Sequence, residues 1–357
     1  MLLVIFGAGA SYDSVHHLPP PSRSASGQSN LGTPPIVSAL GPHEQFRPPL
    51  ANQLFENRDW FVPIMQEFGD FRSLVTSLRT ANSVERRLAE LQKEAETLEI
   101  RHCQLAAICY YLQSVIWSCQ KNWQKHHAGI TNHAAFLETI ELWRRPLNEQ
   151  VCIVTFNYDT MIEQAMSQVL RIDFDTFSRY ISDENYRLIK LHGSIDWGRE
   201  VVSPVAPRSP GDIVGNAANM KLSEQYGKVV QRPVAFDDGK VGFPALAIPV
   251  EKKSEFVCPP AHLEALANLI SRVTKIIAIG WRATERHFLE MLTNRLMGLQ
   301  GDVDLMVVSG DENGVKETVN NLAIGSVKSE RKRALRSDGF SGLMNQSGRG
   351  HLESFLR

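Results

Sequence analysis

Close to its amino end the chain reads Leu2-Leu-Val-Ile-Phe6, and Gly7-Ala-Gly-Ala-Ser11 follows directly. The first five residues are a short, continuous apolar run of the kind found in strands that are buried on both faces of a parallel sheet. The glycines at positions 7 and 9 predict a turn whose backbone can approach a phosphate group closely. The dinucleotide fingerprint is incomplete, because its third glycine position holds Tyr12. The glycines alone therefore do not establish nucleotide binding.

Apolar runs of strand length recur along the chain and alternate with helical segments. The runs that predict strands cover residues 2–6, 151–156, 187–191, 245–250, 275–280 and 303–308. The segments between them that predict helices cover 161–170, 259–270 and 284–297. This alternation is typical of a parallel sheet that helices cover on both faces. The predicted fold class is therefore α/β, with a Rossmann-like parallel sheet and an inserted helical subdomain.

The insertion is predicted from helical patterning over residues 50–145. Its clearest part has apolar residues at steps of three, four and seven over 84–116, which predicts a long amphipathic helix with a break near His102. That apolar stripe serves either core packing or an oligomer face. The expected divisions are one domain over 1–345 with its sheet drawn from 1–15 and 148–325, a helical insertion over 50–147, and a C-terminal tail over 346–357. A Pro-, Ser- and Gly-rich loop over 16–49 is a candidate lid, and 198–242 is expected to be irregular.

Composition excludes several classes of protein. The chain has 357 residues and a formal net charge of −1, so no overall basic field favours nucleic acid. The basic run over 328–336 is interpreted as a solvated helix face or tail. Five cysteines are scattered without a Cys-x-x-Cys pair, which favours a reducing cytosol and argues against a zinc ribbon. No signal peptide and no membrane-length apolar stretch is found, so we expect a soluble, cytoplasmic protein with no membrane contact.

Polar residues follow four of the later predicted strands at the point where each strand ends. In an open parallel sheet, ligands bind beyond the carboxyl ends of the strands. Such residues also have a structural explanation when each is taken alone. Asn157 or Asp159 would serve as a helix cap, and His192 before glycine as a turn residue. The residues concerned are Asn157 and Asp159, His192, Gly280 and Trp281, and Ser309.

Three segments together resemble signatures of the sirtuin superfamily. They are Gly7-Ala-Gly-Ala-Ser11, Thr155-Phe-Asn-Tyr-Asp159 and Lys190-Leu-His-Gly-Ser194, in that order along the chain. The chain is more similar to the bacterial sirtuin-like branch of anti-phage defence systems, which residues 47–55, 279–281, 339–342 and 351–355 also resemble. The likeness spans nearly the whole sequence.

The resemblance implies a role for each matching residue around NAD⁺, which would be the substrate. Asn157 and Asp159 would hold the nicotinamide ribose and the attacking water, and His192 would act as general base or orient the ribose hydroxyls. The residues implied in cofactor binding are Gly7, Ala8, Gly9 and Ser11 at the diphosphate, with Gly193, Gly280, Trp281 and Ser309 toward the phosphate and adenosine half.

One departure from sirtuin deacylases bears on the reaction. Their four-cysteine zinc module follows the His-Gly motif, whereas residues 193–257 here contain no cysteine. Residues 156–159 also read Phe-Asn-Tyr-Asp where deacylases carry Gln-Asn-Ile-Asp. Docking of an acyl-lysine peptide is therefore in doubt, no metal is expected, and transfer of ADP-ribose to water is the reaction left over.

The leading hypothesis is an NAD⁺ glycohydrolase that depletes NAD⁺ during phage infection. The chemistry suits it, because nicotinamide leaves as a neutral pyridine and a carboxylate can stabilise the oxocarbenium-like centre. The resemblance implies control by self-oligomerisation through the 84–120 helix or by a partner such as a HerA-like ATPase or an Argonaute-type protein. Two alternatives remain open: a non-catalytic module that senses NAD⁺ or ADP-ribose, and a protein deacylase or ADP-ribosyltransferase.

Overall fold

The computed structural model describes residues 1–15, 43–250, 256–296, 303–324 and 332–357. Within them the main sheet has six strands in the order β3-β2-β1-β7-β8-β9, and every neighbouring pair is parallel. These strands are β1 (Leu2–Phe6), β2 (Val151–Thr155), β3 (Tyr186–Lys190), β7 (Lys275–Ile279), β8 (Asp304–Val308) and β9 (Arg333–Arg336). The predicted α/β class with a parallel sheet is confirmed.

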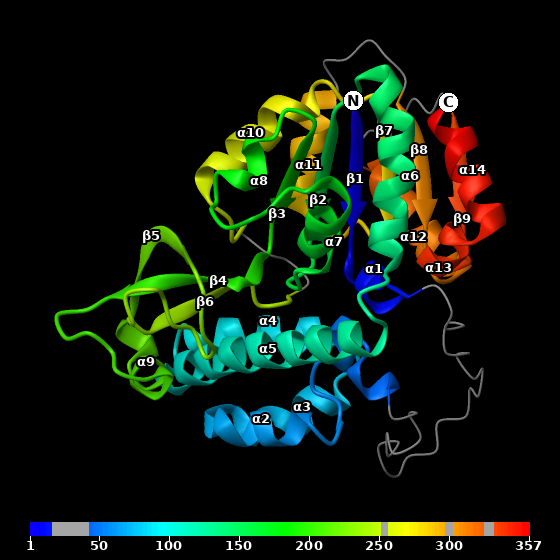
Figure 1. The fold of residues 1–357 in the computed structure, drawn as a ribbon. Coiled ribbons are helices and arrows are strands. Elements are labelled where there is room, and N and C mark those ends of the chain that lie inside the picture. The colour runs from blue at the N-terminus through cyan, green and yellow to red at the C-terminus, as the bar shows by residue number, and fades with distance from the viewer. Residues whose placement is uncertain (16–42, 251–255, 297–302, 325–331) are drawn as a thin grey trace, which may run out of the picture.

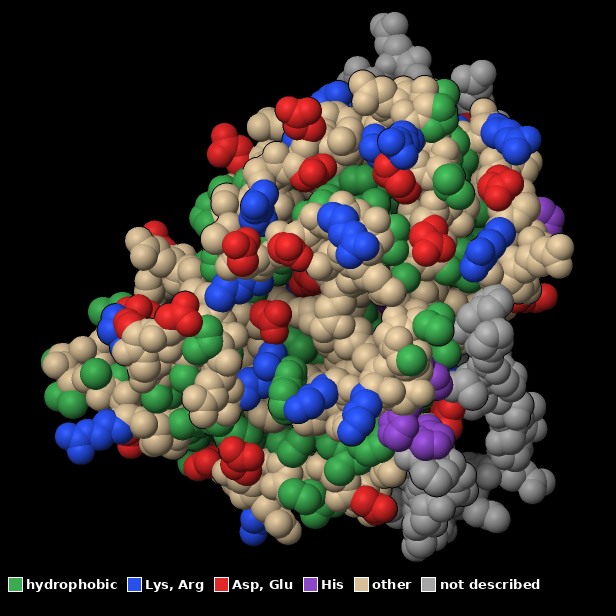
Figure 2. All heavy atoms as spheres, viewed as in Figure 1, with side chains coloured by type: hydrophobic (Ala, Val, Ile, Leu, Met, Phe, Trp, Pro, Cys, Tyr) green, Lys and Arg blue, Asp and Glu red, His purple; other side chains and the backbone are tan. Residues whose placement is uncertain are grey.

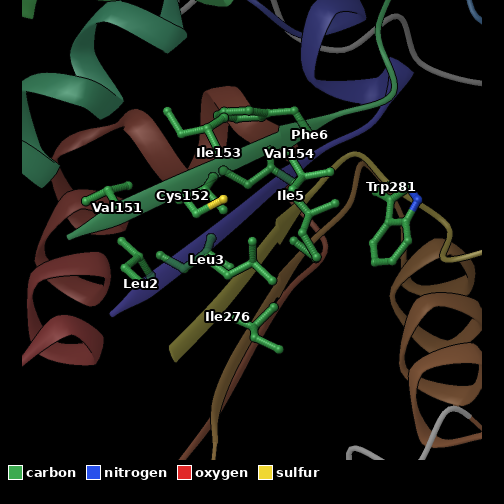
Figure 3. Packing of buried hydrophobic residues seen from close by; sticks show 14 of the residues in the cluster. Leu2, Leu3, Ile5, Phe6, Val151, Cys152, Ile153, Val154, Ile276 and Trp281 are labelled. Atoms are coloured by element: carbon green, nitrogen blue, oxygen red, sulfur yellow. The ribbon is translucent and has the colours of Figure 1, made fainter. Parts of the chain in front are cut away.

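Strand β1 lies in the middle of the sheet and is buried along its whole length. All five of its residues have an exposed fraction of 0%. Leu2 pairs with Val151 on one side and with Lys275 on the other, so the three strands start in the same register. Figure 3 shows how the apolar side chains of β1 and β2 pack beside one another. Because helices cover both faces of the sheet, every side chain of this strand is buried, which explains its uninterrupted apolar run.

The helices divide between the two faces of the sheet. From β1 the sheet grows through β2 and β3, and from β7 it grows the opposite way through β8 and β9. Right-handed crossovers in opposite directions place their helices on opposite faces. Helix α6 contacts α7, α13 and α14, whereas α10 contacts α11 (Figure 1). The bounds are α6 (Asn132–Leu147), α7 (Met161–Leu170), α8 (Arg179–Ser182), α10 (Pro260–Ile270), α11 (Arg286–Leu296), α12 (Glu312–Ile324), α13 (Gly339–Met344) and α14 (Gln346–Leu356).

A second lobe lies beneath the carboxyl ends of the main strands in Figure 1. It contains α2 (Phe61–Glu67), α3 (Val75–Thr80), α4 (Val84–Ala95), α5 (Glu99–His126) and α9 (Pro210–Gly215), with a sheet of β4 (Gly193–Val202), β5 (Lys221–Lys228) and β6 (Gly242–Leu246). The small sheet is antiparallel in the order β5-β4-β6. Its core joins Ile108 and Leu112 of α5 to Ile195 and Leu246 of the small sheet. The lobe is therefore assembled from two separate stretches of the chain.

The predicted long helix is broken as expected, into α4 and α5, but the break lies a few residues before His102. The chain leaves the helix after α4 and reaches an extended conformation at Leu98, with φ −124° and ψ 100°. His102 lies inside α5 instead. Leu98 fits the apolar spacing, yet it is 47% exposed and does not belong to the buried stripe. Spacing alone could not separate this exposed leucine from the core residues.

The prediction that residues 198–242 are irregular is also wrong in part. This segment contains the end of β4 and the whole of β5, whose sequence Lys-Leu-Ser-Glu-Gln-Tyr-Gly-Lys lacks an apolar run. Strand β6 ends at Leu246, whereas the sequence predicted a strand over 245–250. These half-exposed strands are held by backbone hydrogen bonds to their antiparallel neighbours. Those bonds do not depend on an apolar side-chain pattern, so the sequence gives little sign of the strands.

The C-terminal part is more ordered than predicted. The expected tail forms helix α14, in which Leu352 and Phe355 are buried. Part of the basic run, predicted as a helix face or tail, forms the edge strand β9, so the main sheet continues beyond residue 325. Residues 328–331 of that run, and residues 16–42 of the predicted lid loop, lie outside the described residues.

The viewed face carries no block of one charge. Figure 2 shows acidic and basic side chains interspersed over both lobes, in keeping with the net charge of −1. Within the described residues, no helix is long and apolar enough to span a bilayer.

Candidate active site

Two glycine turns meet where β1 and β7 end. Helix α1 (Ala8–Tyr12) begins here, and the N–H of Gly9 donates to the carbonyl oxygen of Gly280 at 3.0 Å. A Cβ at Gly9 would lie 2.8 Å from Gly280 Cα, and a Cβ at Gly7 would lie 2.5 Å from Gly280 O. Gly280 itself has φ +62°. The close approach of the two turns therefore requires glycine, and it occurs where the strand order reverses direction.

Ser11, Asn157 and Asp159 form one hydrogen-bonded cluster beside this contact. Ser11 Oγ donates to Asp159 Oδ2 at 2.6 Å, and Asn157 Nδ2 donates to Ser11 Oγ at 2.8 Å and to the carbonyl oxygen of Gly7 at 2.9 Å. The exposed fractions of the three residues are 3%, 7% and 5%. Asn157 Oδ1 is buried without a hydrogen-bond partner among the described residues. The structure thus brings together three of the residues singled out in the sequence.

The turn after β2 orients this cluster. The N–H of Asn157 donates to Thr155 Oγ1 at 3.1 Å, which bends the chain away from the strand. Asp159 Oδ1 accepts from the N–H of Met161 at 3.1 Å at the start of α7. Asp159 is thus not the N-cap of α7, which is Thr160, although its Oδ1 bonds the first N–H of the helix while its Oδ2 accepts from Ser11.

His192 follows β3 on the adjacent strand and is 3% exposed. Its ring lies 4.8 Å from the ring of Phe156 and 6.3 Å from that of Tyr158, the two residues that flank Asn157. The next residue, Gly193, has φ +82°, and a Cβ there would lie 1.8 Å from the carbonyl oxygen of Ala245. Gly193 is therefore required by the turn into β4.

Trp281 and Ser309 end the neighbouring strands on the other side of β1. The Trp281 ring stacks on Phe156 at 5.4 Å with an interplanar angle of 10°, and its Nε1 donates to Glu285 at 2.5 Å. Figure 3 shows this indole beside a helix beyond the end of its strand. Trp281 is thus part of the packed core. Ser309 is half-buried at the end of β8, where its N–H donates to the carbonyl oxygen of Arg336 at 3.0 Å.

Sequence reasoning missed the buried polar groups that hold the turn containing Asp159. Lys190 Nζ lies 2.9 Å from Glu163 Oε1 and also donates to the carbonyl oxygen of Asp159. From the second lobe, Gln120 donates to Thr160 Oγ1 at 2.7 Å and accepts from the Thr160 N–H at 2.7 Å. A lysine at the end of an apolar strand was the one available signal, since a charge there needs a buried partner.

A further missed contact ties the loop after α1 to the C-terminal part of the chain. Asp13 accepts from the N–H of Ser341 at 2.9 Å, and its backbone carbonyl accepts from Asn132 Nδ2 at 2.8 Å. Burial raises the pKa of the Asp13 carboxyl, although its hydrogen bonds with Ser341 oppose this shift. Burial likewise raises the pKa of Glu163 despite the opposing Lys190.

Neither a metal site within the described ranges nor a related sequence was found that would identify the function of this cluster. Across the described part of the chain, no group of three or more His, Cys, Asp or Glu side chains is placed to hold a metal ion. No protein-family model and no curated protein matches the sequence.

Some solved structures are distantly similar. A Sir2 structure with the inhibitor EX-527, 2'-O-acetyl-ADP-ribose and a deacetylated p53 peptide matches at 12% identity and TM-score 0.39, over 100% of this chain and 95% of that chain. A mutant Sir2 homologue with 2'-O-acetyl ADP ribose matches at 16% and 0.39, over 99% and 92%. A Sir2 structure with a p53 peptide and NAD⁺ matches at 13% and 0.36, over 99% and 92%. These TM-scores are too low to support an inference about activity. The fold is therefore assigned from the strand order and register of the sheet itself.

Proposed function

We propose that this chain binds NAD⁺ across the point where its strand order reverses and hydrolyses the nicotinamide–ribose bond. Numbered along the main sheet alone, the six strands have the order 3-2-1-4-5-6, which is that of dinucleotide-binding sheets. In such sheets the ligand lies at the carboxyl ends where the order reverses. Here that place is occupied by the glycine turns at Gly9 and Gly280.

The observation that carries the proposal is the cluster of Ser11, Asn157 and Asp159 at this place. Asn157 Oδ1 offers a buried acceptor to a ribose hydroxyl or to the attacking water. The Asp159 carboxylate would stabilise the positive charge that develops at the anomeric carbon as neutral nicotinamide leaves. Ser11 already bonds Asn157 Nδ2 and Asp159 Oδ2, so a ribose hydroxyl that binds either of these atoms would replace a bond to Ser11. His192, after the adjacent strand, would accept the proton.

The three motifs that resemble sirtuins support the same proposal. We propose that the chain belongs to the bacterial sirtuin-like branch and acts in the cytoplasm as a defence effector. A free enzyme of this kind would harm its host, so we propose control by oligomerisation or by a partner such as a HerA-like ATPase or an Argonaute-type protein. The cysteine-free segment over 193–257 supports water rather than an acyl-lysine as acceptor.

The proposal is tested by incubating the purified chain with NAD⁺, alone and with its genomic neighbours, and measuring free nicotinamide and ADP-ribose by mass spectrometry. We expect release by the wild type and a loss of about 100-fold or more in Asn157→Ala, Asp159→Ala and His192→Ala. Asn219→Ala, at an exposed asparagine of the second lobe, is the control and should retain full activity. Label transferred to protein would instead indicate an ADP-ribosyltransferase.

A second candidate is a non-catalytic module that binds NAD⁺ or ADP-ribose. It is favoured by the bonds that already occupy the Asp159 carboxylate, one from Ser11 and one from the Met161 N–H. Saturable NAD⁺ binding by calorimetry without nicotinamide release, under every condition tried, would select this function over hydrolysis.

A further inference from the structure

A buried ion pair lies directly behind the candidate active site. Lys190 is the last residue of β3 and its side chain is 0% exposed, while Glu163 of α7 is 6% exposed. Lys190 Nζ lies 2.9 Å from Glu163 Oε1 and donates a second hydrogen bond to the backbone carbonyl of Asp159. One ammonium group therefore joins β3, α7 and the turn after β2.

Stability alone does not account for this pair. The cost of removing two charges from water is so large that well-packed apolar residues often replace a buried ion pair without loss. What apolar residues could not replace is the hydrogen bond to the carbonyl oxygen of Asp159. That bond restrains the backbone of the residue whose carboxylate bonds Ser11.

Tyr180 holds the Glu163 carboxylate beside the ammonium group of Lys190. Tyr180 OH donates to Glu163 Oε1 at 3.4 Å, and this hydroxyl accepts from Trp197 Nε1 at 3.3 Å and from Lys228 Nζ at 3.0 Å. An unneutralised ammonium so close to Asp159 would oppose positive charge developing on a ribose. The Glu163 carboxylate offsets that charge, so that Lys190 can hold the turn without repelling the transition state.

We infer that Lys190 and Glu163 are a positioning pair, which holds Asp159 in the orientation that NAD⁺ hydrolysis requires. The inference rests on the proposed function and names residues outside the reacting cluster. It predicts a loss in kcat with little change in KM, because the pair acts on the geometry of the transition state and does not touch the ligand.

The test compares kcat, KM and Tm of the wild type, Lys190→Met, Glu163→Gln and the double variant Lys190→Met/Glu163→Leu, with nicotinamide release as the assay. Each single variant leaves a buried partner unpaired and should have a lower Tm. The double variant removes both charges and should regain most of the Tm. Its kcat should stay about 10- to 100-fold low, with KM within about twofold of the wild type.

A matched control is available in the same sheet. Lys275 and Asp304 form a 2.6 Å ion pair at the amino ends of β7 and β8, the edge opposite the candidate site. Lys275→Met/Asp304→Leu should keep the wild-type kcat. If the Lys190 and Glu163 double variant also recovers wild-type kcat, the pair is only structural and the inference is wrong, while the proposed function stands. A wild type that releases no nicotinamide, either alone or with its genomic neighbours, would overturn the proposed function and this inference with it.

Discussion

Ser11 is the residue on which the ends of β1 and β2 converge. Its hydroxyl accepts from Asn157 and donates to Asp159, so one side chain holds an amide and a carboxylate in fixed relation. Charge-assisted bonds of this length are among the stronger hydrogen bonds in proteins.

The neighbouring His133 lies in a different environment, between the rings of Phe6 and Phe340 at 5.2 Å each. Burial lowers the pKa of His133 from 6.5 to about 4.

The pKa of His133 predicts how stability depends on pH. The unfolded chain binds a proton at this histidine near pH 6.5 and the folded chain only near pH 4, so acidification between these values favours unfolding. The free energy of unfolding should fall by up to about 3 kcal/mol over this window through this residue.

Urea unfolding at pH 7 and pH 4.5 measures this effect. His133→Leu should show a smaller loss than the wild type, whereas His287→Leu, at an exposed position, should match the wild type. Burial also lowers the pKa of His262, so part of the pH dependence will remain in the variant. An equal loss of unfolding free energy between pH 7 and pH 4.5 in the wild type and in His133→Leu would contradict the prediction.

Helix α5 carries two buried glutamines seven residues apart, one bonded to the small sheet of its own lobe and one bonded to the turn after β2. Gln113 donates to the carbonyl oxygen of Ile195 at 2.9 Å, and Gln120 makes two bonds of 2.7 Å to Thr160. Both side chains are buried, at 0% and 4% exposed. The spacing of seven puts them on one face of the helix, toward the ends of the main strands. The helix therefore also holds the turn after β2, through Thr160.

At the scale of this helix we predict unequal effects of two identical substitutions. Gln120→Leu leaves the Thr160 N–H buried without its acceptor and should lower the free energy of unfolding by about 2 kcal/mol. Gln113→Leu should cost less, because the Ile195 carbonyl keeps a bond of 3.2 Å from Arg232. Chemical denaturation of both variants checks the order, and a larger loss in Gln113→Leu would refute it.

Among the described residues, two large apolar cores share the chain in alternation, beside a small cluster around Trp123. The first core surrounds the main sheet, and the second lies between α5 and the small sheet. The second core includes Ile195, Ile213 and Leu246, which the chain reaches only after completing β1, β2 and β3. Helix α6 lies inside the predicted insertion over 50–147, yet its Phe136 and Leu137 pack on the main sheet.

This division predicts that the insertion does not fold alone. A fragment of residues 50–147 lacks the small-sheet half of its core and exposes the apolar face of α6, so too little apolar surface is buried to offset the chain entropy. Circular dichroism on heating should show no cooperative transition for the fragment, in contrast to the full chain. A sharp transition in the fragment would show that it is an independent domain.

The sequence by itself determined five of the six main strands, all except β9, and the position of the polar residues at their ends. A strand such as β1 is apolar throughout because it is buried on both faces. A continuous apolar run of this kind can be recognised from a few neighbouring residues of the sequence. Parallel strands end at one edge of a sheet, so Asn157 and His192 were expected near each other before any contact was known.

Only the tertiary structure decided which partners these residues have. Ser11 reaches Asp159 across 148 positions of sequence, and Lys190 pairs with Glu163 from a different element. The direction of a side chain beyond a strand end depends on turn geometry, and a buried charge is satisfied by whatever the fold brings to it. Neither property has a period or a local composition, which is why Lys190 could be singled out as a charge at a strand end but its partner Glu163 could not be predicted.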